Sequence, residues 1–334
     1  MRRQKIFILL FLCLLFRNSI AQNKTPFPDS LFHPDSLRAI VEILASDSLE
    51  GRLTGSVGCL KAAAFIATEF QKAGLKPVAG MNGFFMPFSG NSGNIVGAIR
   101  GKTKPYELVI FSAHYDHIGT ATTNPYPHFG GTGKVRSGDA IYNGANDNAS
   151  GVSAVISLAK YFAKQNNIER TLLFVAFAGE EQGLLGSKYF SSMVEPDSII
   201  AVINLEMIGR KYDKSGKPYM TGSLNSNLID ILNRRLFENN AEIYGKKYIM
   251  RDKFTNEKLF SRSDNYPFAL LGIPAHTIMA TSPTDDYYHS LGDEVSTLDF
   301  KLMNEIIKAI AISCQGLVDG TDTPKRLKNP KWML

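Results

Sequence analysis

The stretch TLLFVAFAGEEQGLLGSKYF, Thr171 to Phe190, joins a largely apolar run to a helical pattern through two adjacent glutamates. The run from Thr171 to Ala178 is continuous rather than alternating, which is typical of a strand buried on both faces of a sheet. The segment 184–193 then predicts a helix. A strand followed closely by a helix favours an α/β fold with a mostly parallel sheet, and it places Glu180 and Glu181 where that strand ends.

The same alternation continues through the rest of the chain. Further strands are predicted at 94–101, 107–113, 201–208 and 275–280, and helices at 55–75, 151–165 and 299–318. Helices between parallel strands cover both faces of the sheet. In such sheets, sites form beyond the carboxyl ends of the strands.

The N-terminal segment MRRQKIFILLFLCLLFRNSIAQNK predicts a cleaved signal peptide over residues 1–21. Its apolar run, Ile6 to Phe16, is shorter than the roughly 20 residues that a membrane span needs. We therefore expect an exported protein, periplasmic or secreted, without a membrane span. Residues 22–334 show no linker and no repeat, and they predict a single domain with a core at about 34–320.

The charge balance argues against polyanionic partners. The whole chain has 37 basic and 31 acidic residues, and removal of residues 1–21 leaves 33 basic residues and a net charge of +2. Without a basic stripe, neither nucleic acid nor an anionic membrane surface is an expected partner. Cys59 and Cys314 remain after cleavage, and whether they pair stays open, as does the oligomeric state.

Ionisable residues gather where the predicted strands end. These residues are His114 and Asp116, then Glu180 and Glu181, then Glu206, together with Asp147 in NGANDNASG and His289 in DDYYHS. Each alone has an ordinary structural explanation, such as a helix cap or a solvated turn. The carboxylates of Asp147, Glu180, Glu181 and Glu206 at one edge would nevertheless repel each other, so the set predicts a bound cation.

Imidazole and carboxylate ligands favour zinc, and manganese and cobalt remain open as alternatives. The five candidate ligands are His114, Asp147, Glu181, Glu206 and His289, which is too many for one catalytic zinc and suits two ions about 3.5–4 Å apart, bridged by a carboxylate and a water. Glu180 is then free to act as the general base. It would take a proton from the bridging water, and the hydroxide would attack a polarised carbonyl group.

Six motifs in this order resemble those of the M28 family of zinc aminopeptidases: SAHYDHIG, NGANDNASG, AGEEQGLLGSKYF, NLEMIGR, RSDNYPF and YYHSLGD. The resemblance runs from about residue 50 to the last predicted helix. It implies an α/β/α sandwich on a mixed, mostly parallel sheet.

The resemblance also implies a role for each site residue. His114, Asp147 and Glu206 would hold one metal ion, and Asp147, Glu181 and His289 the other, with Asp147 as the bridge and Glu180 as the base. It also implies that Asp116 would orient a ligand from behind it, that Tyr288 would help to stabilise the oxyanion, and that Asp264 and Asp293 would support the site.

Three features depart from the family pattern or extend beyond it. Many members have Asp where this chain has Glu206, and the extra methylene can move that ligand. His117, three residues after His114, is expected at the surface or behind the ligands. The Gly-, Thr- and Pro-rich segment 119–142 predicts a long loop that shapes the substrate pocket or lies on the surface.

The expected activity is removal of N-terminal residues from peptides, with Glu180 and Glu206 as candidates to bind the free amino group. Three alternatives remain open. A glutaminyl cyclase of the same fold would use one zinc. A carboxypeptidase would need a basic residue for the substrate carboxylate, for which Arg210 and Arg262 are candidates. A non-catalytic binding protein would have lost ligands or the base, whereas all six positions here hold competent residues.

Overall fold

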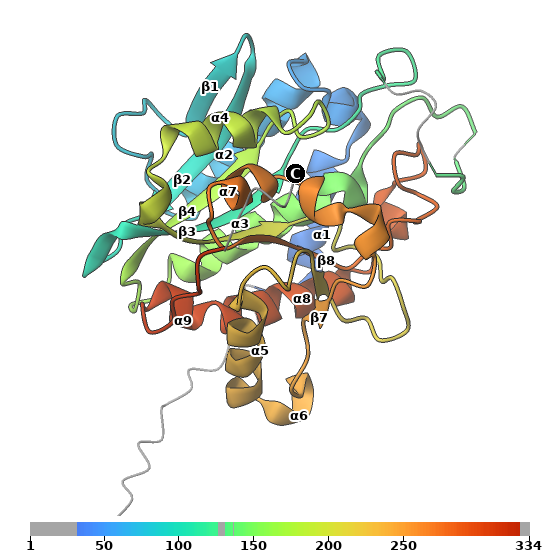
Figure 1. Cartoon of the computed structure of the whole chain (residues 1–334). Coiled ribbons are helices and arrows are strands. Elements are labelled where there is room, and N and C mark those ends of the chain that lie inside the picture. Colours follow the sequence, from blue (N-terminus) through green and yellow to red (C-terminus); the bar gives the residue numbers. More distant parts are fainter. Residues whose placement is uncertain (1–31, 126–130, 136, 328–334) are drawn as a thin grey trace, which may run out of the picture.

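The computed structural model describes residues 32–125, 131–135 and 137–327, and the predicted signal peptide lies outside these ranges. The described residues form a sheet of eight strands in the order β1-β2-β4-β3-β5-β8-β6-β7 (Figure 1). The strands are β1 (Phe85–Ser89), β2 (Ser92–Ile99), β3 (Lys104–His114), β4 (Arg170–Phe177), β5 (Ile199–Leu205), β6 (Tyr219–Met220), β7 (Met250–Arg251) and β8 (Ala275–Met279).

The centre of the sheet is parallel and its edges are mixed. β3 pairs in parallel with β4 on one side and with β5 on the other, and β5 pairs in parallel with β8. β2 runs antiparallel to β1 and to β4, and β6 runs antiparallel to β8. The carboxyl ends of β3, β4 and β5 therefore meet at one edge, as the sequence predicts.

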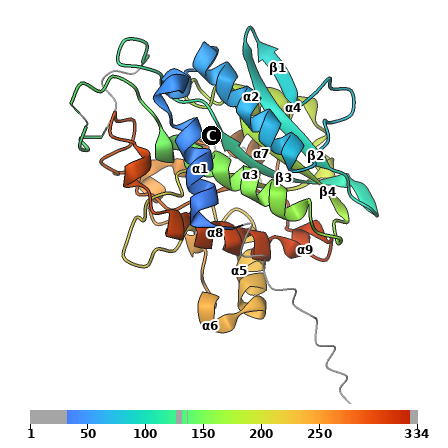
Figure 2. The same cartoon turned by 180° about the vertical axis from the view of Figure 1, so that it is seen from behind.

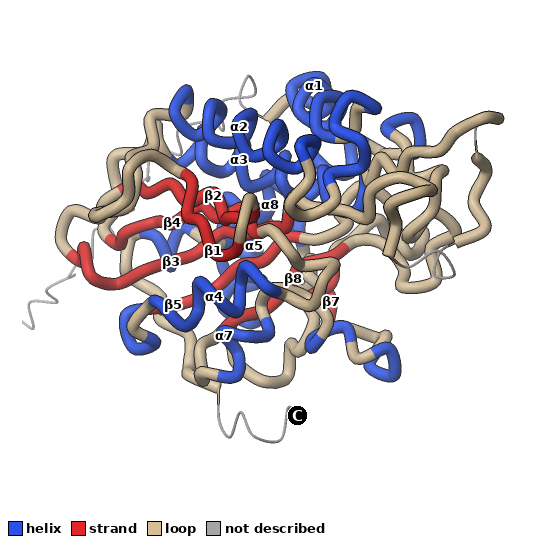
Figure 3. Tube along the Cα trace, turned by 90° about the horizontal axis from the view of Figure 1, so that it is seen from above, coloured by secondary structure: helices blue, strands red, loops and turns tan. Residues whose placement is uncertain are grey.

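Helices cover both faces of the sheet, which confirms the α/β/α prediction. α1, α2, α3 and α8 lie on one face and α4 and α7 on the other (Figures 2 and 3). α5 packs against α8. The helices are α1 (Pro34–Leu44), α2 (Val57–Lys72), α3 (Gly151–Phe162), α4 (Leu185–Met193), α5 (Leu228–Asn239), α6 (Ala241–Tyr244), α7 (Tyr266–Leu270), α8 (Phe300–Ser313) and α9 (Gln315–Val318).

Alternate residues of β4 supply the two cores, which explains its continuous apolar run. Phe174 stacks with Phe111 of β3, with ring centroids 5.5 Å apart, in the core beneath α3. Its neighbour Phe177 points the other way and contacts Phe190 of α4 and Phe268 of α7. Each fully buried side chain of this size stabilises the fold by about 1.5–3 kcal/mol, so β4 holds both helical layers to the sheet.

Some elements differ from the sequence prediction. The helix expected over 299–318 is interrupted after Ser313, and a short second helix follows at Gln315. Cys59 and Cys314 are free, and both are buried. Within the described ranges, no helix is long and apolar enough to cross a membrane.

Candidate metal centre

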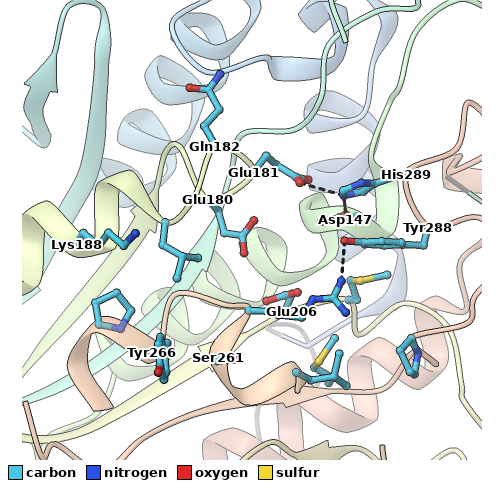
Figure 4. Close-up of a pocket in the computed structure, with 18 of the residues that line it drawn as sticks. Asp147, Glu180, Glu181, Gln182, Lys188, Glu206, Ser261, Tyr266, Tyr288 and His289 are labelled. Carbon is cyan, nitrogen blue, oxygen red and sulfur yellow. Dashed lines mark hydrogen bonds and ion pairs between the residues drawn. The ribbon is translucent and has the colours of Figure 1, made fainter. Parts of the chain in front are cut away.

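The parallel strands bring all six predicted site residues to one edge of the sheet. His114 is the last residue of β3, Glu180 and Glu181 follow β4, and Glu206 follows β5 directly. Because β3 lies between β4 and β5, these strand ends are neighbours. His289 reaches them from the segment after β8, and Asp147 from the helical turn Ala145–Ser150 (Figure 4).

Asp147 lies between the two imidazoles. Its Oδ1 is 3.2 Å from His114 Nε2, and its Oδ2 is 3.2 Å from His289 Nε2. Glu181 Oε2 is 3.0 Å from the same His289 nitrogen. On the other side, the ligand atoms of His114, Glu180 and Glu206 all lie within 4.8 Å of one another. The ligand atoms of His114, Asp147 and Glu181 are equally close together, so these described residues offer two groups that could each hold a metal ion.

The residues present fit zinc. His289 Nε2 is buried and lies 3.2 Å from Asp147 Oδ2 and 3.0 Å from Glu181 Oε2. An imidazole nitrogen and carboxylate oxygens that converge in this way could hold one cation. Imidazole nitrogens with carboxylate oxygens form the donor set of catalytic zinc sites.

Charges in the cluster are unbalanced without cations. Burial opposes a charged imidazole, but Glu181 and Asp147 outweigh it and raise the pKa of His289 to about 10. Burial, together with the charge of Asp147, raises the pKa of Glu206 to about 7. Burial also raises the pKa of Glu180 well above its usual range, and the charges of Glu206 and Glu181 add to it. Carboxylates crowded together in this way favour a bound cation.

Asp147 is held in place from both sides of its backbone. Asp293 accepts the backbone N–H groups of Asn146 and Asp147 through its carboxylate, with 3.0 Å from the Asp147 nitrogen. Before the turn, Gly144 has φ 57°, and a Cβ there would lie 2.3 Å from the Asp147 carbonyl oxygen. Only glycine fits this close approach.

Asp116 contacts both a ligand and the candidate base. Its backbone carbonyl oxygen lies 3.2 Å from His114 Nδ1, while its carboxylate Oδ1 lies 3.8 Å from that nitrogen. The carboxylate instead accepts the hydroxyl of Thr54 at 2.7 Å and the backbone N–H of Glu180 at 3.2 Å. Asp116 thus orients His114 through its backbone and Glu180 through its side chain.

His117 lies behind the ligands, which is one of the two positions expected from the sequence. It is fully buried, and its Nδ1 lies 2.9 Å from Glu181 Oε1. The same nitrogen is 3.9 Å from Asp147 Oδ2. Its spacing from His114 carries no signal of this contact, because the chain leaves strand geometry after His114.

Tyr288 stacks on His289, with ring centroids 3.9 Å apart. His289 itself has φ 50°, a conformation that is uncommon outside glycine and that concentrates at functional sites. Arg262 donates a hydrogen bond of 3.4 Å to the Tyr288 hydroxyl oxygen. Burial and the charge of Glu181 raise the pKa of Tyr288 well above its usual value, so its hydroxyl stays protonated.

The two candidate arginines differ in their environment. Arg210 is bound by Asp285 and Asp293, so it is not available to a substrate. Arg262 is exposed and lines the cleft.

Asp264, two residues further on, is fully buried, and its pKa is raised to about 7 by burial and by the nearby charges of Asp116 and Glu206.

Five members of the cluster, Asp147, Glu180, Glu181, Glu206 and His289, line a cleft of about 860 Å³ (Figure 4). Its apolar lining includes Leu184, Met207, Leu259, Tyr266, Leu270 and Met279. Described residues of the 119–142 loop do not line this cleft. Gly131 and Gly133 of that loop donate backbone hydrogen bonds to the carbonyl oxygens of Tyr288 and Asp286, so the loop supports the segment that carries His289.

The fold is an α/β/α sandwich, and imidazoles, carboxylates and a separate glutamate lie at the carboxyl edge of its sheet. Together these features define a metal-dependent hydrolase. Residues 94–313 match the model of peptidase family M28. The chain therefore belongs to peptidase family M28, and zinc is the metal that this membership implies.

Curated relatives agree with this assignment. A probable zinc metalloprotease of Phaeosphaeria nodorum is 26% identical over 276 residues, which cover 71% of this chain and 54% of the relative. An aminopeptidase of Bacillus subtilis is 24% identical, with 71% of this chain and 47% of the relative covered. The chain thus spans about half the length of these relatives.

Solved structures confirm the fold. An aminopeptidase of Legionella pneumophila superposes with a TM-score of 0.67 at 18% identity, covering 87% of this chain and 74% of that one. The glutaminyl cyclase of Porphyromonas gingivalis superposes with a TM-score of 0.62 at 19% identity, covering 87% and 99%. Both activities therefore occur on this fold.

Proposed function

We propose that this protein is a di-zinc aminopeptidase that removes N-terminal residues from peptides. The observation that carries the proposal is the position of Asp147, whose two carboxylate oxygens each lie 3.2 Å from a different imidazole. His114, Asp147 and Glu206 would hold one zinc, and Asp147, Glu181 and His289 the other. The name of the Bacillus subtilis relative supports the choice of aminopeptidase.

Zinc in this cluster supplies a Lewis acid that polarises the peptide carbonyl and makes a water easier to deprotonate. Glu180 accepts that proton, because its carboxylate points into the cleft between Glu181 and Glu206 (Figure 4). The same carboxyl group then returns the proton to the leaving amine. Arg262 donates to the oxygen of Tyr288, so the phenol hydrogen is free to bond the developing oxyanion.

Recognition of the amino terminus rests on the excess of carboxylates. Asp147, Glu181 and Glu206 would serve as ligand carboxylates, and Glu180 is not needed as a ligand. An ammonium group beside Glu180 and Glu206 would be attracted by their carboxylates. An acylated amino terminus has no such charge, and its extra atoms would enter the cluster.

The test uses a decapeptide with a free amino terminus and the same peptide acetylated, followed by mass spectrometry over time. Stepwise loss of residues from the amino end of the free peptide, with the acetylated peptide intact, supports the proposal. Stepwise loss from the carboxyl end, or equal cleavage of both peptides, contradicts it.

Glutaminyl cyclisation is the second candidate, favoured by the fold of the Porphyromonas gingivalis enzyme. A peptide that begins with glutamine separates the two reactions, because cyclisation releases ammonia and keeps every residue. Loss of the glutamine residue supports the peptidase, whereas loss of ammonia alone supports the cyclase.

We further propose that the protein is exported to the periplasm or the medium. The basic and apolar pattern of residues 1–21 supports this location. N-terminal sequencing of the protein recovered from outside the cytoplasm tests it, and a mature chain that begins at Gln22 is the expected result.

A further inference from the structure

The charged lining of the cleft is acidic except at two positions. Asp147, Glu180, Glu181 and Glu206 are its acids, while Lys188 of α4 and Arg262 are the lysine and the arginine among the described lining residues. The two cations come from different elements. Arg262 contacts the residue next to a candidate ligand, whereas Lys188 lies on α4, well away from Tyr288 (Figure 4).

Arg262 keeps most of its bonding capacity unused. It precedes Ser263, whose hydroxyl donates to Glu206, and its own contact is the 3.4 Å hydrogen bond to Tyr288. No carboxylate in the described parts of the chain forms an ion pair with it. Arg210, by contrast, is saturated by two aspartates. A guanidinium has five N–H donors in a planar fork that matches a carboxylate, so Arg262 can still bind one.

The position of Arg262 limits the length of such a ligand. Its guanidinium is separated from His289 by one phenol ring, that of Tyr288, which stacks on the imidazole. An extended peptide advances about 3.5 Å per residue. With its scissile carbonyl at the metal cluster, a peptide therefore reaches Arg262 within one or two residues.

We propose that Arg262 binds the C-terminal carboxylate of the substrate, so that dipeptides and tripeptides with a free carboxyl end are the preferred substrates. This inference rests on the proposed peptidase function and adds the substrate class to it. Arg262 would bind the carboxyl end of the substrate, and the carboxylates of Glu180 and Glu206 would bind its amino end. The substrate would then lie across the cleft with both of its charges compensated.

The experiment compares the dipeptide Leu-Ala, its C-terminal amide and leucine anilide on the zinc-loaded protein. We expect kcat/KM for Leu-Ala to exceed that for the amide by about 10-fold or more, because hydrogen bonds to charged groups contribute about 1.5–3 kcal/mol. In Arg262→Gln this acid-over-amide ratio should fall towards one. Arg262→Lys should keep part of it, since a lysine supplies the charge without the fork.

Lys188→Gln is the matched control, and it should retain the wild-type acid-over-amide ratio. An equal rate on the acid and the amide in the wild type would overturn the proposal. So would a proportional loss on all three substrates in Arg262→Gln, which would mean that Arg262 acts only through Tyr288. A ratio that depends on Lys188 instead would overturn it as well. Failure to hydrolyse any of the three substrates would contradict the proposed peptidase function itself.

Discussion

Among single residues, Glu180 is the one that distinguishes catalysis from metal binding. Its neighbour Glu181 contacts His117 and His289, whereas Glu180 points into the cleft. We expect Glu180→Gln to retain zinc and to lose hydrolysis by about 10²–10⁴-fold, the usual contribution of a general base. Zinc content and kcat/KM on leucine anilide measure the two effects.

The matched control for Glu180→Gln is Gln182→Ala, because Gln182 is an exposed residue of the same cleft. This control should change neither quantity substantially. If Glu180→Gln kept wild-type turnover, Glu180 could not be the base.

A second test of a single residue concerns the support that His117 gives to Glu181. Its Nδ1 lies 2.9 Å from Glu181 Oε1, so it fixes one oxygen of that carboxylate and leaves the other directed at His289. We expect His117→Ala to weaken zinc affinity by about 10–100-fold, as is usual when a partner of a ligand is lost. His117→Asn, which keeps a donor near the Nδ1 position, should recover most of the affinity.

Competition with a chromophoric chelator gives these zinc affinities directly. Wild-type affinity in His117→Ala would show that Glu181 needs no such support.

At the scale of elements, Arg52 connects the segments that carry the site. It is 1% exposed and donates to the carbonyl oxygens of Leu44 at the end of α1, of Tyr115 after β3, and of Asn143 and Gly144 before Asp147. We expect Arg52→Met to lower the free energy of unfolding by about 3 kcal/mol or more, because each buried carbonyl left without a donor costs about 1–3 kcal/mol.

Urea unfolding measures this change. The exposed Arg251→Met serves as control, and it should alter stability by less than about 0.5 kcal/mol. Equal effects of the two substitutions would rule out the proposed role of Arg52.

His276 of β8 makes the stability of the fold depend on pH. Its Nδ1 lies 2.9 Å from the Thr221 carbonyl oxygen and its Nε2 lies 2.7 Å from the Ser226 hydroxyl, so the neutral ring donates from Nδ1 and accepts at Nε2. Burial lowers its pKa to about 4. The unfolded chain takes up the proton below about 6.5, and the folded chain does so only below about 4. Stability from this group is therefore complete above pH 6.5 and is lost as the pH falls towards 4.

Between pH 7 and 5.5, the wild type should lose about 1 kcal/mol more unfolding free energy than His276→Asn, which cannot titrate. Groups common to both proteins cancel in this difference. Parallel pH profiles would show that His276 is not held neutral in the folded state.

The sequence predicts some strands and helices well and misses others. β4 and β8 lie within a residue of their expected bounds, and every residue of both strands is buried. α1 and α5 were not predicted, although α1 begins with Pro34 and buries Leu37 and Val41. The two-residue strands β6 and β7 are too short for any periodicity to reveal.

At the scale of the whole molecule, topology decides which strand ends meet. The sequence places Glu180, Glu206 and His114 at strand ends, but the order β4-β3-β5 makes those ends neighbours. The motif set, rather than periodicity, predicts that His289 and Asp147 lie near these strand ends, because both residues come from irregular segments. The contacts of Arg52 and His117 join residues far apart in the chain, and no local pattern encodes them.

The most direct test of a di-zinc peptidase is a zinc titration of the metal-free protein, followed by hydrolysis of leucine anilide at each step. Activity should rise until two equivalents of zinc per chain are bound, with chelation reversing the gain. Saturation of both binding and activity at one equivalent, or two bound equivalents without hydrolysis, would contradict the proposed site.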